Sequence, residues 1–129
     1  MRITDLLDAR SVSLTSSPKT KSEALDQAVA LMTKSGKIND EEAYRSQVYA
    51  REEESTTGIG EGIAIPHGKC DAVSRPGLAA MVIKNGVDFD SLDGEPVTLL
   101  FLIAAPNTKD NVHLDVLSKL SVNSSSISI

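Results

Sequence analysis

The amino-acid sequence predicts an α/β fold in which a mixed β-sheet is sandwiched between α-helices. Two amphipathic helical segments lie in the first half of the chain, over residues 20–36 and 39–53. Apolar segments typical of strands follow, and the most continuous one, VTLLFLIAA at residues 97–105, has too few polar positions for a solvated face. Segments of both kinds within 129 residues indicate one domain with a single core.

The N-terminal part is expected to hold a short helical turn, a brief strand and then a clear helix. The turn is placed at residues 6–7 and the strand at SVSL, residues 11–14. The helix begins at a capping box, in which Thr20 is followed three residues later by Glu23. Apolar residues then recur at helical spacing until Gly36, which is predicted to end the helix.

The second helix has a similar start signal. Asn39 is followed three residues later by Glu42, and apolar residues continue a helical face through about Glu53. Two runs of acids, NDEEA near its start and REEES at its end, are interpreted as helix ends and solvated faces. We therefore assign no paired-carboxylate chemistry to this helix.

The second half of the chain is expected to complete the sheet. A hairpin is predicted from LAAMVI at residues 78–83, a turn at KNG, and VDF at residues 87–89. The apolar segment 97–105 is placed in the middle of the sheet, covered on both sides, and ends at Pro106. A third helix is expected from about Asp110, with an apolar side formed by Val112, Val116, Leu117 and Leu120.

The domain is expected to span residues 1–121, and residues 122–129 form an atypical tail. Helical periodicity ends there in serines, which compete for backbone hydrogen bonds, so the tail is expected to be frayed. A C-terminal helix shortened in this way exposes apolar surface. Association with a second copy through the C-terminal region is therefore one expected way of covering that surface.

Composition and charge exclude several classes of protein. A formal net charge of −5 argues against a nucleic-acid-binding face and suits basic protein partners. The longest apolar run is too short to cross a bilayer, and the N-terminal MRITDLLDAR has acids where a signal peptide would be apolar. The single cysteine, Cys70, cannot form an internal disulfide, which fits a reducing compartment. We expect a cytoplasmic protein without membrane insertion or a nucleic-acid partner.

His67 is the first candidate for a functional residue, because its neighbours frame it. It follows an expected strand at residues 63–65 and stands between Pro66, which fixes the direction of the backbone, and Gly68, which adds little bulk. Open sheets place ligands at strand ends. Nearby N–H groups could also approach an anion at Gly58, Gly60 and Gly62. The alternative is a solvated histidine in an ordinary turn.

The second histidine, His113, falls in the first turn of the expected third helix, just beyond strand 97–105. A helix N-terminus carries unpaired N–H groups and a positive dipole end, which favour an anion. The two histidines of the chain could therefore flank one phosphate-sized site. The alternative is a partly exposed helix residue without a role.

Two segments carry a resemblance to a known family. STTGIGEGIAIPHGK, residues 55–69, followed by NVHLDVLSKLS, residues 111–121, resembles the enzyme IIA domain of the fructose and mannitol class (type 2) of the bacterial sugar phosphotransferase system. The similarity runs over about residues 1–121 and is closest to fructose-specific IIA. It implies a phosphotransferase that needs no cofactor or metal. In that family the IIA domain does not touch the sugar.

The resemblance also implies roles for individual residues. His67 matches the histidine that accepts a phosphoryl group from the phosphocarrier HPr, as a tele-phosphohistidine, and passes it to the IIB domain of a membrane sugar permease. His113 matches a histidine that contacts the active imidazole and the phosphate. Arg51 matches an arginine at the end of the second helix, which stabilises the phosphate.

The chemistry of phosphoryl transfer fits these residue types. With an ordinary pKa of about 6.5, an imidazole is largely neutral and nucleophilic near neutral pH. A guanidinium such as Arg51 supplies planar donors to the equatorial oxygens, and His113 can add a hydrogen bond. Without the resemblance, Arg51 would be interpreted as a surface residue paired with a neighbouring glutamate.

Other functions stay open at this point. A nitrogen-type regulatory IIA protein has the same motif and takes phosphate, but it signals by binding other proteins. A metal-binding module is a remote alternative, in which His67, Cys70 and His113 would hold zinc, although a single cysteine lacks the paired spacing of zinc motifs. A Cys/His nucleophilic pair is also conceivable, but an isolated cysteine is more often a small packing residue.

Overall fold

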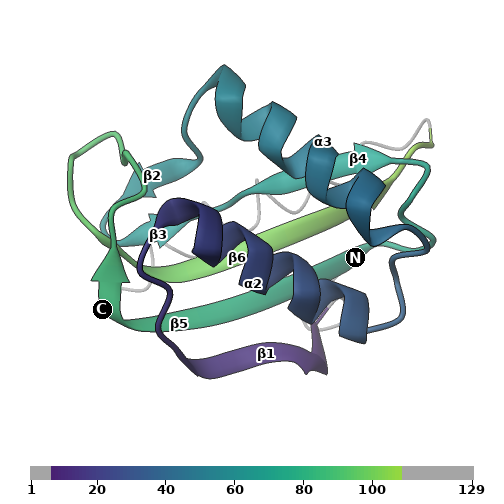
Figure 1. The fold of residues 1–129 in the computed structure, drawn as a ribbon, viewed down its shortest axis with the longest axis horizontal. Helices are drawn as coiled ribbons and strands as arrows, with labels where there is room; N and C mark the ends of the chain where they lie inside the picture. Colours follow the sequence, from purple (N-terminus) through teal and green to yellow (C-terminus); the bar gives the residue numbers. More distant parts are fainter. Residues whose placement is uncertain (1–6, 109–129) are drawn as a thin grey trace.

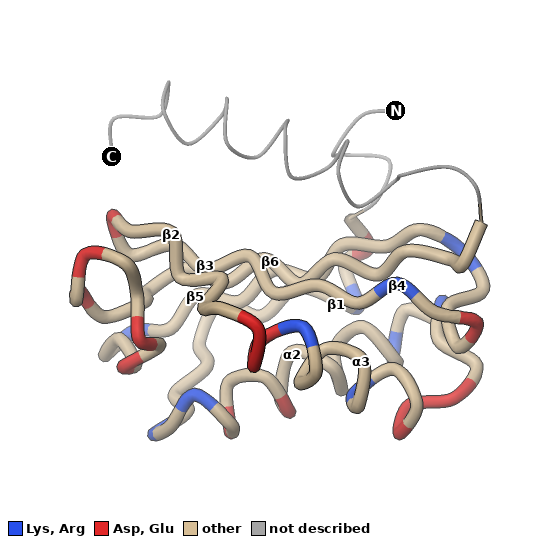
Figure 2. Tube along the Cα trace, turned by 90° about the horizontal axis from the view of Figure 1, so that it is seen from above, with Lys and Arg blue, Asp and Glu red and all other residues tan. Residues whose placement is uncertain are grey.

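The computed structural model describes residues 7–108, and within them helices cover one face of a single mixed sheet (Figures 1 and 2). The helices are α2 (Lys21–Lys34) and α3 (Glu41–Glu54). The strands are β1 (Leu7–Ser16), β2 (Gly58–Gly60), β3 (Ile63–Ala64), β4 (His67–Cys70), β5 (Gly77–Val87) and β6 (Val97–Pro106). The predicted α/β class and mixed sheet are confirmed. The expected third helix and the tail 122–129 lie outside the described residues.

Strand β6 lies in the middle of the sheet, as its continuous apolar sequence predicts. The strand order is β1-β5-β6-β3-β2, and β4 pairs with β6 beyond the end of β3. Strands β5 and β6 are antiparallel, whereas β3 and β4 run parallel to β6. The register sets His67, the first residue of β4, opposite Ile103 of β6.

Helix α2 begins and ends where its cap residues predict. The Thr20 hydroxyl accepts a hydrogen bond from the Glu23 N–H at 3.1 Å, and the Glu23 carboxylate accepts one from the Lys19 N–H at 3.2 Å. Gly36 follows the helix with a φ of +80°, a conformation that glycine adopts without strain. The helix packs an apolar face on the sheet through Ala24, Leu25, Ala28, Val29 and Met32.

Helix α3 begins one residue later than predicted. Asp40, and not Asn39, is the N-cap residue, because its carboxylate accepts the Ala43 N–H at 3.2 Å. The Asn39 amide instead donates to the Asp71 carbonyl and contacts the Ser74 hydroxyl, both at 3.2 Å. Both residues are good N-caps, so only these tertiary contacts decide between them.

Two predictions about strands are wrong in extent. Residue 7 belongs to strand β1, which continues to Ser16, instead of to a helical turn. The predicted hairpin at residues 78–89 does not form, because β5 runs unbroken from Gly77 to Val87 and pairs with β6 on both sides of a register shift. Gly86 has a φ of +74° there. Glycine inside a strand marks a bulge as readily as a turn, which explains the error.

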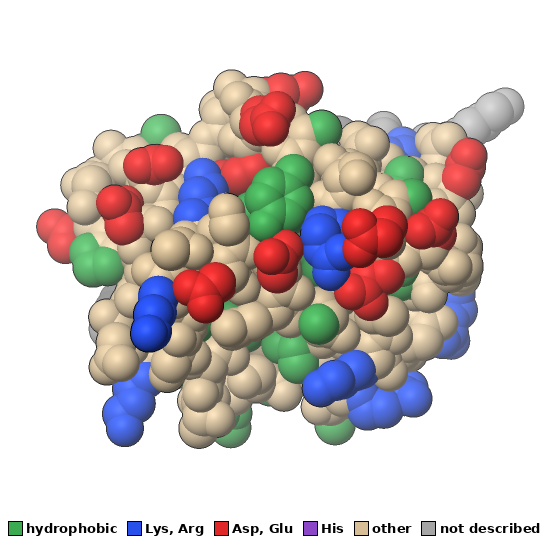
Figure 3. Space-filling view, viewed as in Figure 1, with side chains coloured by type: hydrophobic (Ala, Val, Ile, Leu, Met, Phe, Trp, Pro, Cys, Tyr) green, Lys and Arg blue, Asp and Glu red, His purple; other side chains and the backbone are tan. Residues whose placement is uncertain are grey.

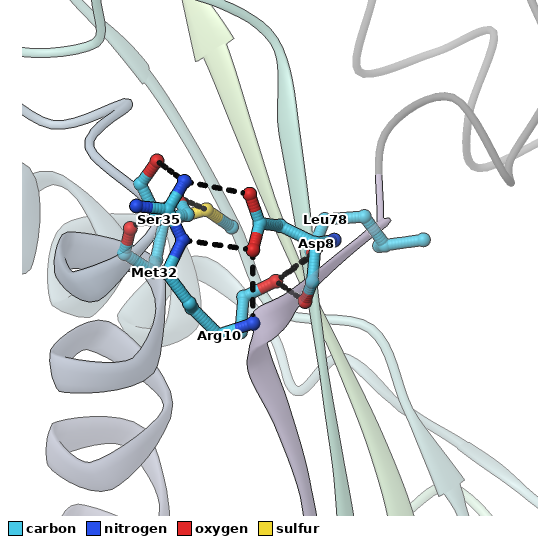
Figure 4. Close-up of polar contacts among 6 residues, drawn as sticks. Asp8, Arg10, Met32, Ser35 and Leu78 are labelled. Carbon is cyan, nitrogen blue, oxygen red and sulfur yellow. Dashed lines mark hydrogen bonds and ion pairs between the residues drawn. The ribbon is translucent and has the colours of Figure 1, made fainter.

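The edge strand β1 is joined to α2 by a polar cluster (Figure 4). The Arg10 guanidinium donates to both oxygens of Asp8, at 3.0 and 2.9 Å, and to the Ser35 carbonyl at the end of α2, at 3.3 Å. This contact holds the pKa of Asp8 well below its ordinary value. The buried Ser11 hydroxyl lies 3.0 Å from the Leu78 carbonyl of β5.

The core of the described residues lies between the sheet and the two helices. Its largest fully buried side chains include Tyr44 of α3 and Phe89 beyond β5. Neither of these helices is long and apolar enough to cross a membrane. Acidic and basic side chains are interspersed over the face that carries the helices (Figure 3).

Candidate functional site

His67 lies at a break between two short strands that pair with the same side of β6. Strand β3 ends at Ala64, and β4 begins at His67, so the histidine follows a short strand, as expected, and also begins the next one. The Pro66 carbonyl accepts the Ile103 N–H at 3.0 Å, which ties the residue before the histidine to β6. The site therefore stands on the central strand of the sheet.

The imidazole of His67 is oriented by its own backbone segment. Its Nδ1 atom lies 3.2 Å from the carbonyl oxygen of Ile65, a buried residue. A carbonyl oxygen can only accept, so in this contact Nδ1 carries the hydrogen and Nε2 has the nucleophilic lone pair. Burial lowers the pKa of His67 from its ordinary value of 6.5, while the bond to Ile65 opposes that shift. The neutral imidazole is therefore the prevailing form at neutral pH.

A shallow hollow of about 210 Å³ lies beside His67, and we call it the His67 hollow. Helix α3 packs along β4 (Figure 1), and its residues form one wall of the hollow. The lining residues are Gln47, Ala50, Arg51 and Glu54 of α3 and His67, Gly68 and Lys69 of β4. The structure thus brings together two of the predicted site residues, Arg51 and His67. The third, His113, lies outside the described residues.

Arg51 lies in the last turn of α3, where its guanidinium is tied to the end of the helix. Its Nη1 atom donates to the Ser55 carbonyl at 2.9 Å and lies 3.5 Å from the Ser55 hydroxyl. A cation is favoured at a helix C-terminus by the helix dipole. Arg51 therefore lines the His67 hollow with its guanidinium held at the end of the helix.

Glu52, the next residue, corrects the prediction that the acids of REEES are all solvated. Glu53 and Glu54 are exposed, but Glu52 is only 7% exposed. Its carboxylate accepts the Thr57 N–H at 2.8 Å and the Thr57 hydroxyl at 2.7 Å, and it pairs with Lys21 at 2.9 Å. A run of acids at a helix end conceals this role in the sequence.

Side chains of α3 pack closely against the backbone of β4 next to the histidine. A Cβ atom on Gly68 would lie 3.0 Å from Cε1 of Tyr44 and 3.1 Å from Cγ2 of Val48. The buried Tyr44 hydroxyl donates to the Ile103 carbonyl at 2.8 Å, and burial raises the pKa of this phenol. The strand residue opposite His67 is therefore also the residue that anchors α3.

The glycines before the site shape a turn, and none of them lines the His67 hollow. Gly60 and Gly62 have positive φ values, +105° and +79°, at the turn between β2 and β3. Gly58 lies against Ser91, whose hydroxyl would be 2.4 Å from an added Cβ. The suggestion that N–H groups at these glycines approach an anion therefore stays a prediction, which the lining of the His67 hollow does not support.

Metal ligands do not cluster in the described part of the chain. Among residues 7–108, no group of three His, Cys, Asp or Glu side chains is placed to hold an ion. Cys70 is half-buried and packs against the hydrophobic core. The zinc set imagined from the sequence also requires His113, which lies outside these residues.

Sequence reasoning missed Lys21, Gln47, Glu52, Thr57 and Lys69 as residues at or behind the site. A signal for two of them was present. Lys21 begins α2 and Glu52 stands in the last turn of α3, so each charge occupies the helix end that the dipole disfavours. Such a placement indicates a tertiary partner.

Comparisons with known proteins agree with this architecture. Residues 5–126 match the family described as phosphoenolpyruvate-dependent sugar phosphotransferase system, EIIA 2. The chain is 46% identical over 121 residues to the PTS system fructose-specific EIIABC component of Bacillus subtilis, covering 94% of this chain and 19% of that relative. It therefore spans about a fifth of the length of that protein.

Solved structures with the same fold include two informative ones. The nitrogen regulatory protein IIA-Ntr of Neisseria meningitidis superposes with a TM-score of 0.87 at 31% identity, covering 95% of this chain and 84% of that one. The complex of enzyme IIAMTL and phosphorylated enzyme IIBMTL of Escherichia coli gives a TM-score of 0.76 at 29% identity, with coverage of 90% and 81%.

Proposed function

Because the chain belongs to the EIIA 2 family of the phosphoenolpyruvate-dependent sugar phosphotransferase system, whose members are phosphotransfer proteins, we propose that it is a phosphocarrier with His67 as the phosphoryl acceptor. The observation that carries this proposal is the contact between Nδ1 of His67 and the Ile65 carbonyl, 3.2 Å long. It supports Nε2 as the attacking atom and a tele-phosphohistidine as the product.

In the proposed step, Nε2 of His67 attacks the phosphorus atom of a phosphohistidine on HPr. The new Nε2–P bond forms as the P–N bond of the donor breaks, and the donor imidazole leaves with the electron pair of that bond. The Nδ1–H of His67 stays bonded to the Ile65 carbonyl, which stabilises the charge that develops on the ring. Arg51 supplies donors to the phosphoryl oxygens from the rim of the hollow. His113 is assigned a further hydrogen bond.

The phosphoryl group then passes to a IIB domain that serves uptake of a fructose-type sugar, and the protein acts in the cytoplasm. The name of the Bacillus subtilis relative supports the fructose assignment. The Escherichia coli complex of a IIA with a phosphorylated IIB protein supports the kind of partner. Self-association through the C-terminal region, expected from the sequence, concerns residues outside those described.

The acceptor assignment is tested by intact-mass spectrometry after incubation with phosphoenolpyruvate, enzyme I and HPr. We expect one acid-labile phosphoryl group on the wild type and none on His67→Ala. His113→Ala is the matched control, because it removes the other histidine of the chain and should still accept phosphate, while onward transfer is impaired. Uptake by a folded His67→Ala protein would refute the assignment.

A regulatory role is the second candidate function. It is supported by the high TM-score with the nitrogen regulatory protein of Neisseria meningitidis. A transporter component passes its phosphoryl group to an added IIB domain of a fructose-type permease, whereas a regulator keeps its phosphoryl group, the label that is followed here. A chase of the phosphorylated protein with that IIB domain distinguishes the two roles. Retention of the label on His67 would favour the regulator.

A further inference from the structure

A buried acidic residue, Glu52, is linked to His67 through a chain of hydrogen bonds. Glu52 is the one acidic residue counted as buried among those the structure describes, and it follows Arg51 in the last turn of α3. Its two carboxylate oxygens accept hydrogen bonds from the N–H and the hydroxyl of Thr57, at 2.8 and 2.7 Å. The Lys21 ammonium group completes the set at 2.9 Å.

Helix stability does not account for this pair. Lys21 is the first residue of α2 and Glu52 lies at the end of α3, so the dipole of each helix opposes the charge that it carries. Removing two charges from water is also costly, even when they are paired. The Lys21 ammonium group gains a further contact 4.6 Å from the centre of the buried Phe89 ring. The position of the pair therefore calls for another explanation.

A chain of hydrogen bonds leads from the carboxylate to the imidazole. Glu52 holds the N–H of Thr57, and the carbonyl of Thr57 accepts the Ile65 N–H at 3.0 Å. The carbonyl of Ile65 in turn meets Nδ1 of His67 at 3.2 Å. The Glu52 carboxylate thus links two parts of the site. It joins the last turn of α3, which carries Arg51, to the segment that orients His67.

We propose that Glu52, held by Lys21, is a positioning residue that fixes Thr57 and thereby the Ile65 carbonyl, which keeps the hydrogen of the neutral imidazole on Nδ1 of His67. This inference rests on the proposed function, in which His67 accepts the phosphoryl group. The first measurement is independent of that function, because the tautomer of the unphosphorylated imidazole is measured without any phosphoryl transfer.

The test separates the reach of the side chain from its charge. Glu52→Asp keeps a negative charge near Lys21. Its side chain is one methylene shorter, so its oxygens are withdrawn from the N–H and the hydroxyl of Thr57. The double variant Glu52→Gln with Lys21→Met keeps the reach, because the amide oxygen can accept the Thr57 N–H, and removes both charges. Glu53→Asp is the matched control, since it shortens the adjacent exposed glutamate. Thermal unfolding confirms that each variant is folded.

The tautomer of His67 is read by long-range ¹⁵N–¹H NMR of the imidazole above its pKa. We expect the Nδ1–H form in the wild type, in Glu53→Asp and in the double variant, and a mixture of both forms in Glu52→Asp. Uptake from phosphorylated HPr at saturating donor should fall by about tenfold or more in Glu52→Asp, with the KM for the donor nearly unchanged. A folded Glu52→Asp protein with the wild-type tautomer overturns the inference. Loss of uptake in all proteins, wild type included, would instead count against the proposed function.

Discussion

Two ion pairs lie near opposite ends of helix α2, and they have the same length but differ in exposure. Arg10 and Asp8 lie at the C-terminal end of the helix, and Lys21 and Glu52 at its N-terminal end, with a closest separation of 2.9 Å in both pairs. The side chains of the first pair are 63% and 26% exposed, whereas those of the second are 23% and 5% exposed. Water and salt screen the first pair, so its loss costs little, while breaking the second leaves a charge in the protein interior.

The largest expected effect on stability follows from breaking the buried pair. Glu52→Ala leaves Lys21 without its carboxylate and Thr57 without its acceptor, so the free energy of unfolding should fall by about 3–5 kcal/mol. Urea denaturation measures this loss. The control Glu53→Ala removes the same charge from an exposed position and should change the free energy by no more than about 0.5 kcal/mol. Equal effects of the two variants would contradict the comparison.

Two tyrosines of α3 sharpen the comparison without any change of charge. The Tyr44 hydroxyl donates to the Ile103 carbonyl in the core, whereas the Tyr49 hydroxyl lies in an exposed contact with Asp26 at 2.9 Å. Tyr44→Phe should lower the free energy of unfolding by about 1–2 kcal/mol, because it removes a buried hydrogen bond. Tyr49→Phe should cost less, since water can replace the lost partner. Equal losses in urea denaturation would show that burial does not govern these contacts.

How far the sequence could predict this molecule depends on how local each feature is. The start of α2 was predictable because Thr20 and Glu23 are three residues apart and act on the same turn. The continuation of β5 past Gly86 was not, since a bulge and a turn share the same glycine signal and only pairing with β6 separates them.

The site residues also differ in how far the sequence could predict them. His67 belongs to a recognisable motif, whereas Arg51 was assigned only through the family resemblance, and the structure places both at one hollow. Glu52 was misassigned to a solvated face, because its partner Lys21 comes from another helix and is set by tertiary packing. Residues that act through such long-range contacts carry only an indirect sequence signal, here a pair of charges at disfavoured helix ends.

The pKa shifts of His67 and Asp8 provide a further test, because burial causes the first and an exposed charge partner the second. Burial lowers the pKa of His67, so the imidazole stays neutral to a pH below 6.5 and phosphoryl uptake should decline only below that value. NMR titration of His67 at low and high salt should give nearly the same pKa. The pKa of Asp8 should rise toward 3.8 at high salt, because salt screens Arg10. A strong salt dependence of the His67 pKa would contradict burial as its main cause.

The smallest effect is expected from the exposed pair itself. Arg10→Gln removes the guanidinium that lowers the pKa of Asp8, but solvent replaces most of that contact, so the urea midpoint at neutral pH should change little. The sign of the residual effect is fixed. A carboxyl group whose pKa is lower in the folded state stabilises the fold above its unfolded pKa and loses that contribution as the pH falls through the folded value. Any difference between wild type and Arg10→Gln should therefore be present at neutral pH and shrink as the pH falls below 3.8. A difference that stays the same on acidification would mean that Arg10 stabilises the protein through the Ser35 carbonyl, which does not titrate, and not through Asp8.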